Sequence, residues 1–147
     1  MTNNPFVRGI DQFNQREFYA CHDTLEALWM EACDPDKTFY QGILQIAVGC
    51  YHLSNRNWNG AVMLLGEGIR RLRNYQPSYN DVNVRQLVEQ SASMLGRLQA
   101  AGPDRVAECA DRFGLTGEAD ATVTPPPKEG WTLPYIDRAV AADESSA

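Results

Sequence analysis

Apolar residues recur at spacings of three and four in several successive segments, and this repeat constrains the fold more than any other feature of the sequence. Such spacing places apolar side chains on one face of an α-helix, whereas a half-buried strand needs strict alternation. No run of alternating β-branched residues is long enough for a sheet. The sequence therefore predicts an all-α fold.

About five helices are expected, and the short connections between them favour antiparallel neighbours. The first begins after Asn14, whose position three residues before Glu17 is typical of a capping box. It ends at Asp34-Pro35, and the others are expected at about 36–54, from 58 to a stop at Pro77, at 82–101 and at 103–113. The predicted architecture is an antiparallel bundle of about five helices in one domain, residues 1–115, with an extended C-terminal strap.

The second expected helix is apolar around almost its whole circumference, which places it in the centre of the bundle. Gly42 and Gly49 are seven residues apart and therefore lie on the same side of that helix. We expect a neighbouring helix to approach closely there, because a close approach explains why two residues of low helix propensity are tolerated.

Charge and cysteine content limit the classes of partner. The chain has 13 Lys+Arg against 19 Asp+Glu, a formal net charge of −6, so we expect no general nucleic-acid binding, which depends on neutralising phosphates. Its four cysteines show no CxxC or zinc-type spacing, which indicates buried, reduced thiols. The sequence has no apolar run of membrane-spanning length and no signal-peptide pattern, and we expect an acidic, cytoplasmic protein.

The composition changes at Thr116, and the residues from there to 147 are expected to form a separate tail. Its run Pro125-Pro126-Pro127 is typical of an extended linker. The apolar segment 131–136 is expected to dock on the bundle or on a partner subunit, because it is too apolar to be left in water. The predicted docking residues are Trp131, Leu133 and Tyr135, and with Trp58 they make a homo-oligomer the expected assembly.

Polar side chains interrupt the apolar pattern of the first two expected helices. His22 and Glu26 are four residues apart on the first helix and therefore neighbours on one face. Gln41, Gln45 and His52 form a line on the second helix, at spacings of four and seven. If the two lines face each other, the bundle contains a cluster of two imidazoles, one carboxylate and one or two amides.

The sequence leaves three interpretations of this cluster open. Buried polar groups need partners, so the cluster can be a structural hydrogen-bonded network or the lining of a metal-free pocket. His22, Glu26 and His52 are also adequate ligands for a divalent ion that keeps one position open for water. In a third interpretation, Glu26 orients the His22 ring as an acid–base pair. Asp23 points further round the helix and is expected to be a solvated carboxylate.

Several joined motifs resemble a known family. They are FYACHDTLEALW at 18–29, FYQGILQIAV at 39–48, His52, and the stretch from Asn57 through Gly60-Ala61 to Leu64-Leu65. This pattern is similar to that of domain of unknown function 309, with a His, a Glu four residues on, a Trp three further, a QG(L/I)(I/L)Q stretch, a second His and a GNxxGA-like turn. The resemblance covers roughly residues 10–76.

The sequence departs from that family pattern at two places. Asn55-Arg56-Asn57 stands where Gly-Asn is usual, and Asp23 takes a position often held by Glu. The resemblance implies a small all-helical bacterial or archaeal protein and implies no activity. His22, Glu26, Gln45 and His52 are carried over as family-pattern positions without catalytic roles.

Two functions are expected from these observations. The first is an interaction or small-ligand-binding module of unknown activity, whose polar pocket contains His22, Glu26, Gln45 and His52 and which needs no cofactor. The alternative is an enzyme, a metal-assisted hydrolase in which His22, Glu26 and His52 hold a divalent ion that activates water.

Overall fold

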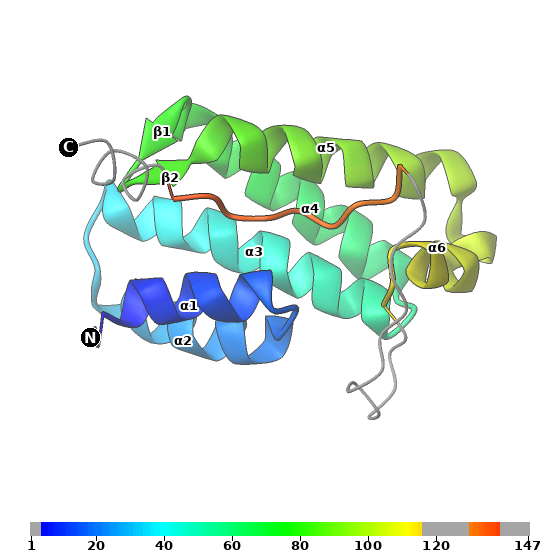
Figure 1. Cartoon of the computed structure of the whole chain (residues 1–147), viewed down its shortest axis with the longest axis horizontal. Helices are drawn as coiled ribbons and strands as arrows, with labels where there is room; N and C mark the ends of the chain where they lie inside the picture. The colour runs from blue at the N-terminus through cyan, green and yellow to red at the C-terminus, as the bar shows by residue number, and fades with distance from the viewer. Residues whose placement is uncertain (1–3, 116–129, 139–147) are drawn as a thin grey trace.

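The computed structural model describes residues 4–115 and 130–138 of the chain. Within these residues it contains six α-helices and one two-stranded hairpin (Figure 1). The elements are α1 (Pro5–Asn14), α2 (Phe18–Glu31), α3 (Asp36–Ser54), α4 (Trp58–Leu72), the 3-10 turn η1 (Arg73–Tyr75), β1 (Ser78–Tyr79), β2 (Val82–Asn83), α5 (Val84–Ala101), the 3-10 turn η2 (Pro103–Arg105) and α6 (Val106–Arg112). The predicted all-α class is confirmed. No helix in the described residues is long and apolar enough to cross a membrane.

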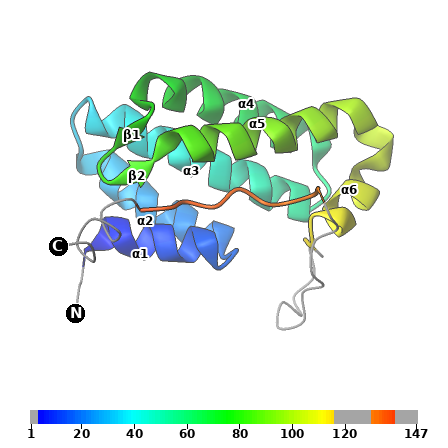
Figure 2. The same cartoon turned by 45° about the horizontal axis from the view of Figure 1, so that its top comes forward.

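Helix α3 lies in the middle of the helical array, as its nearly all-round apolar sequence predicts. It packs against α2 on one side and α4 on the other, while α1 packs on α2 and α5 packs on α4 (Figures 1 and 2). The side chains of α3 that are fully buried include Phe39, Ile43, Ile46 and Leu53. The core therefore runs along α3, and the elements on either side bury their apolar faces against it.

The prediction missed helix α1 and gave Asn14 the wrong role. Asn14 is the last residue of α1, and α2 begins at Phe18 with no side-chain cap. The signals for α1 are nevertheless present, because the Asn4 side chain accepts a hydrogen bond from the Phe6 N–H at 2.8 Å and Pro5 occupies the first helical position.

The hairpin between α4 and α5 was also missed. Asn80 and Asp81 both have positive φ, 53° and 67°, which suits the tight turn between β1 and β2. Asn83 then caps α5 by accepting a hydrogen bond from the Gln86 N–H at 3.1 Å, so this helix starts at Val84 rather than at Val82.

The expected close approach on the glycine side of α3 is confirmed. A Cβ atom added at Gly42 would lie 2.7 Å from Leu72 Cγ of α4, and one added at Gly49 would lie 3.0 Å from Leu65 Cγ. From the other helix, a Cβ at Gly68 would lie 2.7 Å from the Gly42 carbonyl oxygen. The absence of side chains at these positions therefore sets the distance between α3 and α4.

Residues 130–138 run in extended conformation along the helices, between α1 and α5 (Figures 1 and 2). The Asn14 side chain donates to the Ile136 carbonyl at 2.9 Å and accepts from the Ile136 N–H at 2.8 Å. Farther along, Val82 and Arg138 form an isolated antiparallel bridge. The rest of the predicted tail, residues 116–129 and 139–147, lies outside the described residues.

Three of the four cysteines are buried, and all four are free thiols. Burial raises the pKa of Cys21 to about 12 and also raises the pKa of Cys50. Cys33, just beyond the end of α2, is exposed, which corrects the expectation that all the thiols are buried. Cys33 lies in the short connection between α2 and α3.

Candidate functional site

A pocket with a volume of about 290 Å³ lies between α2, α3 and α4. The lining residues are His22, Glu26 and Trp29 from α2, Gln41, Leu44, Gln45 and Val48 from α3, and Leu64 from α4. Four of the five predicted cluster residues thus line one cavity.

Helical spacing explains how the polar side chains reach this pocket. His22 and Glu26 are one turn apart on α2, and Gln41 and Gln45 are one turn apart on α3, so each pair shares a helix face. Because α2 packs directly on α3, the two pairs come to the same cavity.

His52 does not line this pocket, contrary to the predicted cluster. It lies seven residues beyond Gln45, which is about 10 Å further along the helix axis. There its Nδ1 atom is 3.3 Å from Asn57 Nδ2, in the turn before α4. A Cβ added at Gly60 would lie 2.8 Å from the imidazole ring of His52, so the ring packs closely against the first turn of α4. His52 therefore belongs to the α3–α4 connection.

The His22 ring is held from two sides. Its Nδ1 atom is 3.2 Å from Asp23 Oδ1, and its ring stacks on Tyr19 with centroids 5.8 Å apart. In the tautomer in which Nδ1 donates to Asp23, Nε2 keeps its lone pair and can accept a proton or bind a cation.

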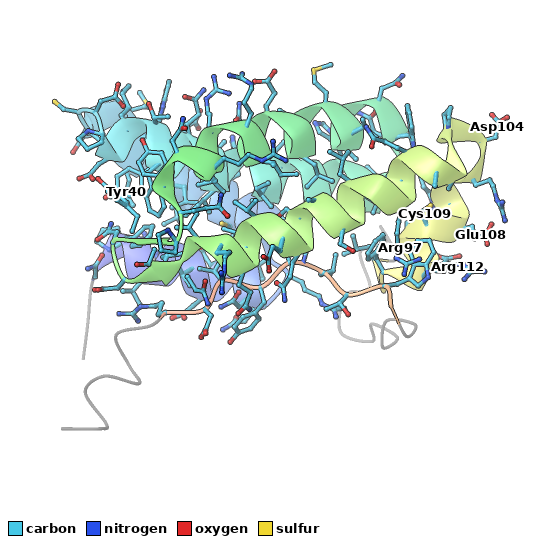
Figure 3. The ribbon with its side chains drawn as sticks, turned by 90° about the horizontal axis from the view of Figure 1, so that it is seen from above. Tyr40, Arg97, Asp104, Glu108, Cys109 and Arg112 are labelled. Carbon is cyan, nitrogen blue, oxygen red and sulfur yellow. The ribbon has the colours of Figure 1, made fainter. Side chains whose placement is uncertain are left out.

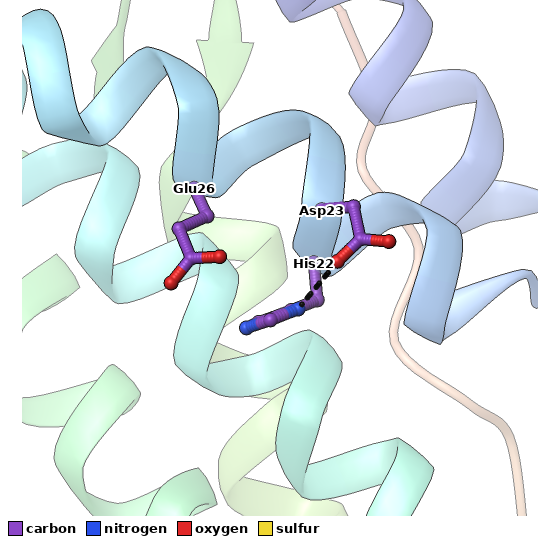
Figure 4. Close-up of side chains that lie close together, drawn as sticks. All are labelled: His22, Asp23 and Glu26. Carbon is purple, nitrogen blue, oxygen red and sulfur yellow. Dashed lines mark hydrogen bonds and ion pairs between the residues drawn. The ribbon is translucent and has the colours of Figure 1, made fainter.

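The structure groups His22 with Asp23 and Glu26 as potential cation ligands (Figure 4). One ligand atom from each of the three residues lies within 4.8 Å of the others. Asp23 and Glu26 are exposed and His22 is partly buried, so this group lies at the solvent edge of the pocket. Asp23 was expected to be a solvated carboxylate; its side chain is 61% exposed and also contacts His22. His52 is absent from this group.

Gln45 is held by a charged network on α4. Arg71 Nη1 donates to Gln45 Oε1 at 3.3 Å and to Glu67 Oε1 at 2.8 Å. Hydrogen bonds from Arg71 and Arg70 lower the pKa of Glu67, so this carboxylate stays ionised and keeps Arg71 in place. The amide oxygen of Gln45 is thus occupied, and its NH₂ group is the part left for a ligand.

Trp29 forms one apolar wall of the pocket and is itself fixed by Lys37. The Lys37 ammonium lies 4.2 Å from the centroid of the Trp29 ring and donates to the Trp29 carbonyl oxygen at 2.7 Å. Together with Leu44, Val48 and Leu64, Trp29 makes most of the pocket surface apolar, and the sequence alone did not distinguish these four from core residues.

The predicted docking residues of the tail lie away from this pocket. Leu133 is buried, and the Trp131 ring packs edge-on against Phe113 of the segment after α6, with centroids 5.0 Å apart. Tyr135 is 51% exposed. Its backbone N–H nevertheless donates to the Gln90 side chain at 2.9 Å.

Comparison with known proteins identifies the part of the chain that contains the pocket. Residues 6–64 match the family described as Domain of unknown function (DUF309). Residues 6–64, called the DUF309 region below, are thus similar to that family. The predicted resemblance is therefore confirmed, over a range that starts and ends earlier than the expected residues 10–76.

The DUF309 region runs from the start of α1 to the middle of α4 and includes every residue that lines the pocket. The chain is also similar to the uncharacterized protein YpuF of Bacillus subtilis (strain 168), with 33% identity over 72 residues. That match covers 47% of this chain and 40% of the relative, so it spans less than half of either protein. No solved structure matches the chain.

Proposed function

We propose that the DUF309 region is a small-ligand-binding module, and that its site is the pocket between α2, α3 and α4. The ligand class that fits best is a small amphiphilic molecule with an apolar body and a positively charged or hydrogen-bond-donating end. The observation that carries the proposal is a pocket with an apolar lining and a carboxylate at its edge.

The size and lining of the pocket limit the body of the ligand. A volume of about 290 Å³ lies just below the usual range for ligand pockets, roughly 300–1,000 Å³, so the ligand must be small. Leu44, Val48, Leu64 and the Trp29 ring offer apolar contact. A short alkyl or small ring system gains most from leaving water at such a surface.

The charge at the pocket edge favours a cationic end group. Glu26 lines the pocket and Asp23 is close beside it, whereas Arg71 and Lys37, which contact lining residues, already donate to Glu67 and to the Trp29 carbonyl oxygen. An ammonium group placed between Glu26 and His22 Nε2 would find two acceptors. A carboxylate end group would instead meet like charge.

Three probes of equal chain length test this preference: n-hexylammonium, 1-hexanol and hexanoate. We expect saturable binding of hexylammonium, followed by amide chemical shifts, with the largest changes at Glu26, Gln45 and Leu64. Hexanol should bind more weakly and hexanoate weakest. Equal binding of all three probes, or shifts concentrated elsewhere, would contradict the proposal.

A second candidate function is a divalent-cation site formed by His22, Asp23 and Glu26, which would support metal-assisted hydrolysis. The proximity of three ligand atoms, within 4.8 Å of one another, favours it. One imidazole and two carboxylates suit Zn²⁺ or Mn²⁺ and leave positions for water, whose pKa a bound ion would lower. His52 is no longer part of this candidate.

Metal uptake separates the two candidates. Native protein without affinity-tag histidines is dialysed against Zn²⁺ or Mn²⁺ and its metal content measured, together with that of Asp23→Asn. Near-stoichiometric metal lost in Asp23→Asn would favour the cation site, because Asp23 does not line the pocket. Absence of uptake would contradict the cation site and would leave the amphiphile proposal to the hexylammonium titration.

We also propose that copies of the chain self-associate. Two of the tryptophans expected to need cover are packed within the chain, since Trp58 Nε1 donates to the Leu98 carbonyl at 2.8 Å and Trp131 contacts Phe113. Large apolar side chains that remain exposed in the described residues are Tyr19, Met30, Met63 and Tyr135. Sedimentation equilibrium of the whole chain should give a mass above 16.4 kDa, and a monomer mass at all concentrations would contradict self-association.

A further inference from the structure

A second and larger pocket has a volume of about 560 Å³. It lies at the C-terminal end of α5, between α5, α6 and the segment that begins at Gly130 (Figure 3). It shares no residue with the pocket between α2, α3 and α4, and all its lining residues lie outside the matched range 6–64. Its charged and aromatic lining residues are Arg97, Arg105, Glu108, Arg112 and Trp131.

This pocket is positively charged on a chain of net charge −6. Three guanidinium groups and a single carboxylate line it, which leaves an excess of positive charge. Low-dielectric walls focus such a charge, so the pocket attracts anions even though the chain as a whole repels them.

The one carboxylate holds two of the arginines in fixed positions. Glu108 Oε1 accepts from Arg105 Nε at 3.1 Å and lies 3.0 Å from its Nη2, and Glu108 Oε2 accepts from Arg112 Nε at 3.1 Å and lies 2.9 Å from its Nη2. Both guanidinium groups thus bind Glu108 through one edge. Neither Nη1 group has a partner among the described residues, so both remain available as donors.

Arg97 has no ion-pair partner in the described part of the chain. Its guanidinium carbon lies 4.6 Å from the centroid of the Trp131 ring, and that of Arg112 lies 5.3 Å from the same centroid. Arg97 Nε is buried and has no hydrogen-bond partner. At Gly130 an added Cβ would lie 2.9 Å from Arg97 Nη2, so the absence of a side chain there leaves room for the guanidinium. The Trp131 ring and Gly130 therefore fix Arg97 without neutralising it.

We infer that this pocket binds the phosphate group of a small phosphate monoester. Three arginines held in fixed orientations by Glu108 and Trp131 match the several acceptor oxygens of a phosphate dianion, which arginine can bind in a bidentate manner. A single carboxylate group would satisfy fewer of these donors. The volume of the pocket leaves room for the esterified part of the molecule as well as for the phosphate.

The test is a titration of the whole chain with glycerol 3-phosphate and, separately, with inorganic phosphate, at ionic strength held constant with sodium chloride. Binding is followed by the Trp131 indole N–H and the Arg97 Nε–H signals in NMR spectra. We expect saturable shifts of both signals, with glycerol 3-phosphate binding more tightly than inorganic phosphate. Tighter binding of inorganic phosphate would overturn the assignment to an ester.

Three variants complete the test. Arg97→Gln should weaken glycerol 3-phosphate binding by tenfold or more. Arg105→Gln should weaken it severalfold, and this side chain is 63% exposed, so the fold does not depend on it. Arg85→Gln is the matched control, because Arg85 is exposed on the first turn of the same helix. The inference is overturned if no saturable binding occurs, if both pocket variants bind like the wild type, or if Arg85→Gln weakens binding as much as Arg97→Gln.

Discussion

His22 and Glu26 are one turn apart on α2 and line the same pocket. His52, the second histidine of the chain, lies instead near the C-terminal end of α3, where it contacts Asn57. The arrangement divides the predicted polar cluster into two parts with different roles. The part formed by His22, Glu26, Gln41 and Gln45 lines one cavity. The part formed by His52 joins α3 to α4.

The close approach of α3 and α4 makes the two helices sensitive to added volume. Gly42→Ala should destabilise the protein by about 1–3 kcal/mol, because the new methyl group would lie 2.7 Å from Leu72 Cγ in a packed core. Urea unfolding followed by circular dichroism measures the difference. Gly66→Ala is the control: nothing lies within 4 Å of an added Cβ there, so this helical position should gain about 0.5–1 kcal/mol. Equal effects of the two substitutions would refute the packing argument.

The Asn14 side chain fastens the segment 130–138 to α1 through two hydrogen bonds to the backbone of Ile136. Asn14→Ala removes both and leaves a partly buried N–H and carbonyl without partners. The free energy of unfolding should fall by about 1–3 kcal/mol, and cleavage by a protease within 130–138 should become faster. Asn59→Ala, at an exposed position of α4, should change neither quantity. If Asn14→Ala behaves like Asn59→Ala, the segment is held by other contacts.

Thiol reactivity tests the burial of the cysteines. In the native protein a thiol reagent should modify Cys33 rapidly and the other three slowly, because Cys21, Cys50 and Cys109 are buried and burial raises the pKa of each. All four should react in denaturant. A Cys33→Ser variant should show almost no rapid reaction, and rapid reaction of a second thiol would place one of the buried cysteines at the surface.

Tyr79 gives stability a pH dependence in the alkaline range. Its hydroxyl donates to Asp36 Oδ1 at 2.5 Å, and chiefly this hydrogen bond raises the pKa of Tyr79 to about 12. A tyrosine in the unfolded chain ionises near pH 10. The stabilisation is therefore fully present below about pH 10 and is lost as the pH rises toward 12.

Comparison of wild type with Tyr79→Phe checks the direction of this pH dependence. Wild type should be the more stable at pH 8, and the difference in unfolding free energy should shrink as the pH approaches 11. Tyr135→Phe removes the hydroxyl of an exposed ring and should show no such trend. A difference that stays constant with pH would mean that the Tyr79 hydrogen bond does not depend on its proton.

Regular spacing made much of the fold predictable. The bounds of α3 and the close helix contact at Gly42 follow from the sequence, because apolar periodicity and small residues act locally. Helix α1 was missed although Phe6, Ile10 and Phe13 have helical spacing and are buried, because the capping-box pattern at Asn14 predicted that the first helix begins only there. The hairpin at Asn80-Asp81 was missed because two-residue strands have almost no periodicity.

The candidate site was predictable only in part. Helical spacing predicted that His22 shares a face with Glu26 and that Gln41 shares a face with Gln45. Which residues of a long helix contact the next helix depends, however, on where the two helices cross. That crossing leaves His52 beyond the pocket and brings Leu64 into it. The larger pocket is lined by side chains of α5, η2 and α6 together with Trp131. These residues are far apart in the sequence, so no local pattern predicts that they meet.

The main proposal is that the pocket between α2, α3 and α4 binds a cationic amphiphile. Its most direct test is the affinity of n-hexylammonium for wild type and for Glu26→Gln, measured by NMR titration at constant ionic strength. Glu89→Gln, which removes one exposed carboxylate from α5, serves as the control for overall charge. We predict that Glu26→Gln weakens binding at least fivefold while Glu89→Gln binds like the wild type. Equal affinity of all three proteins, or no saturable binding to the wild type, would contradict the claim that this pocket binds a cationic amphiphile.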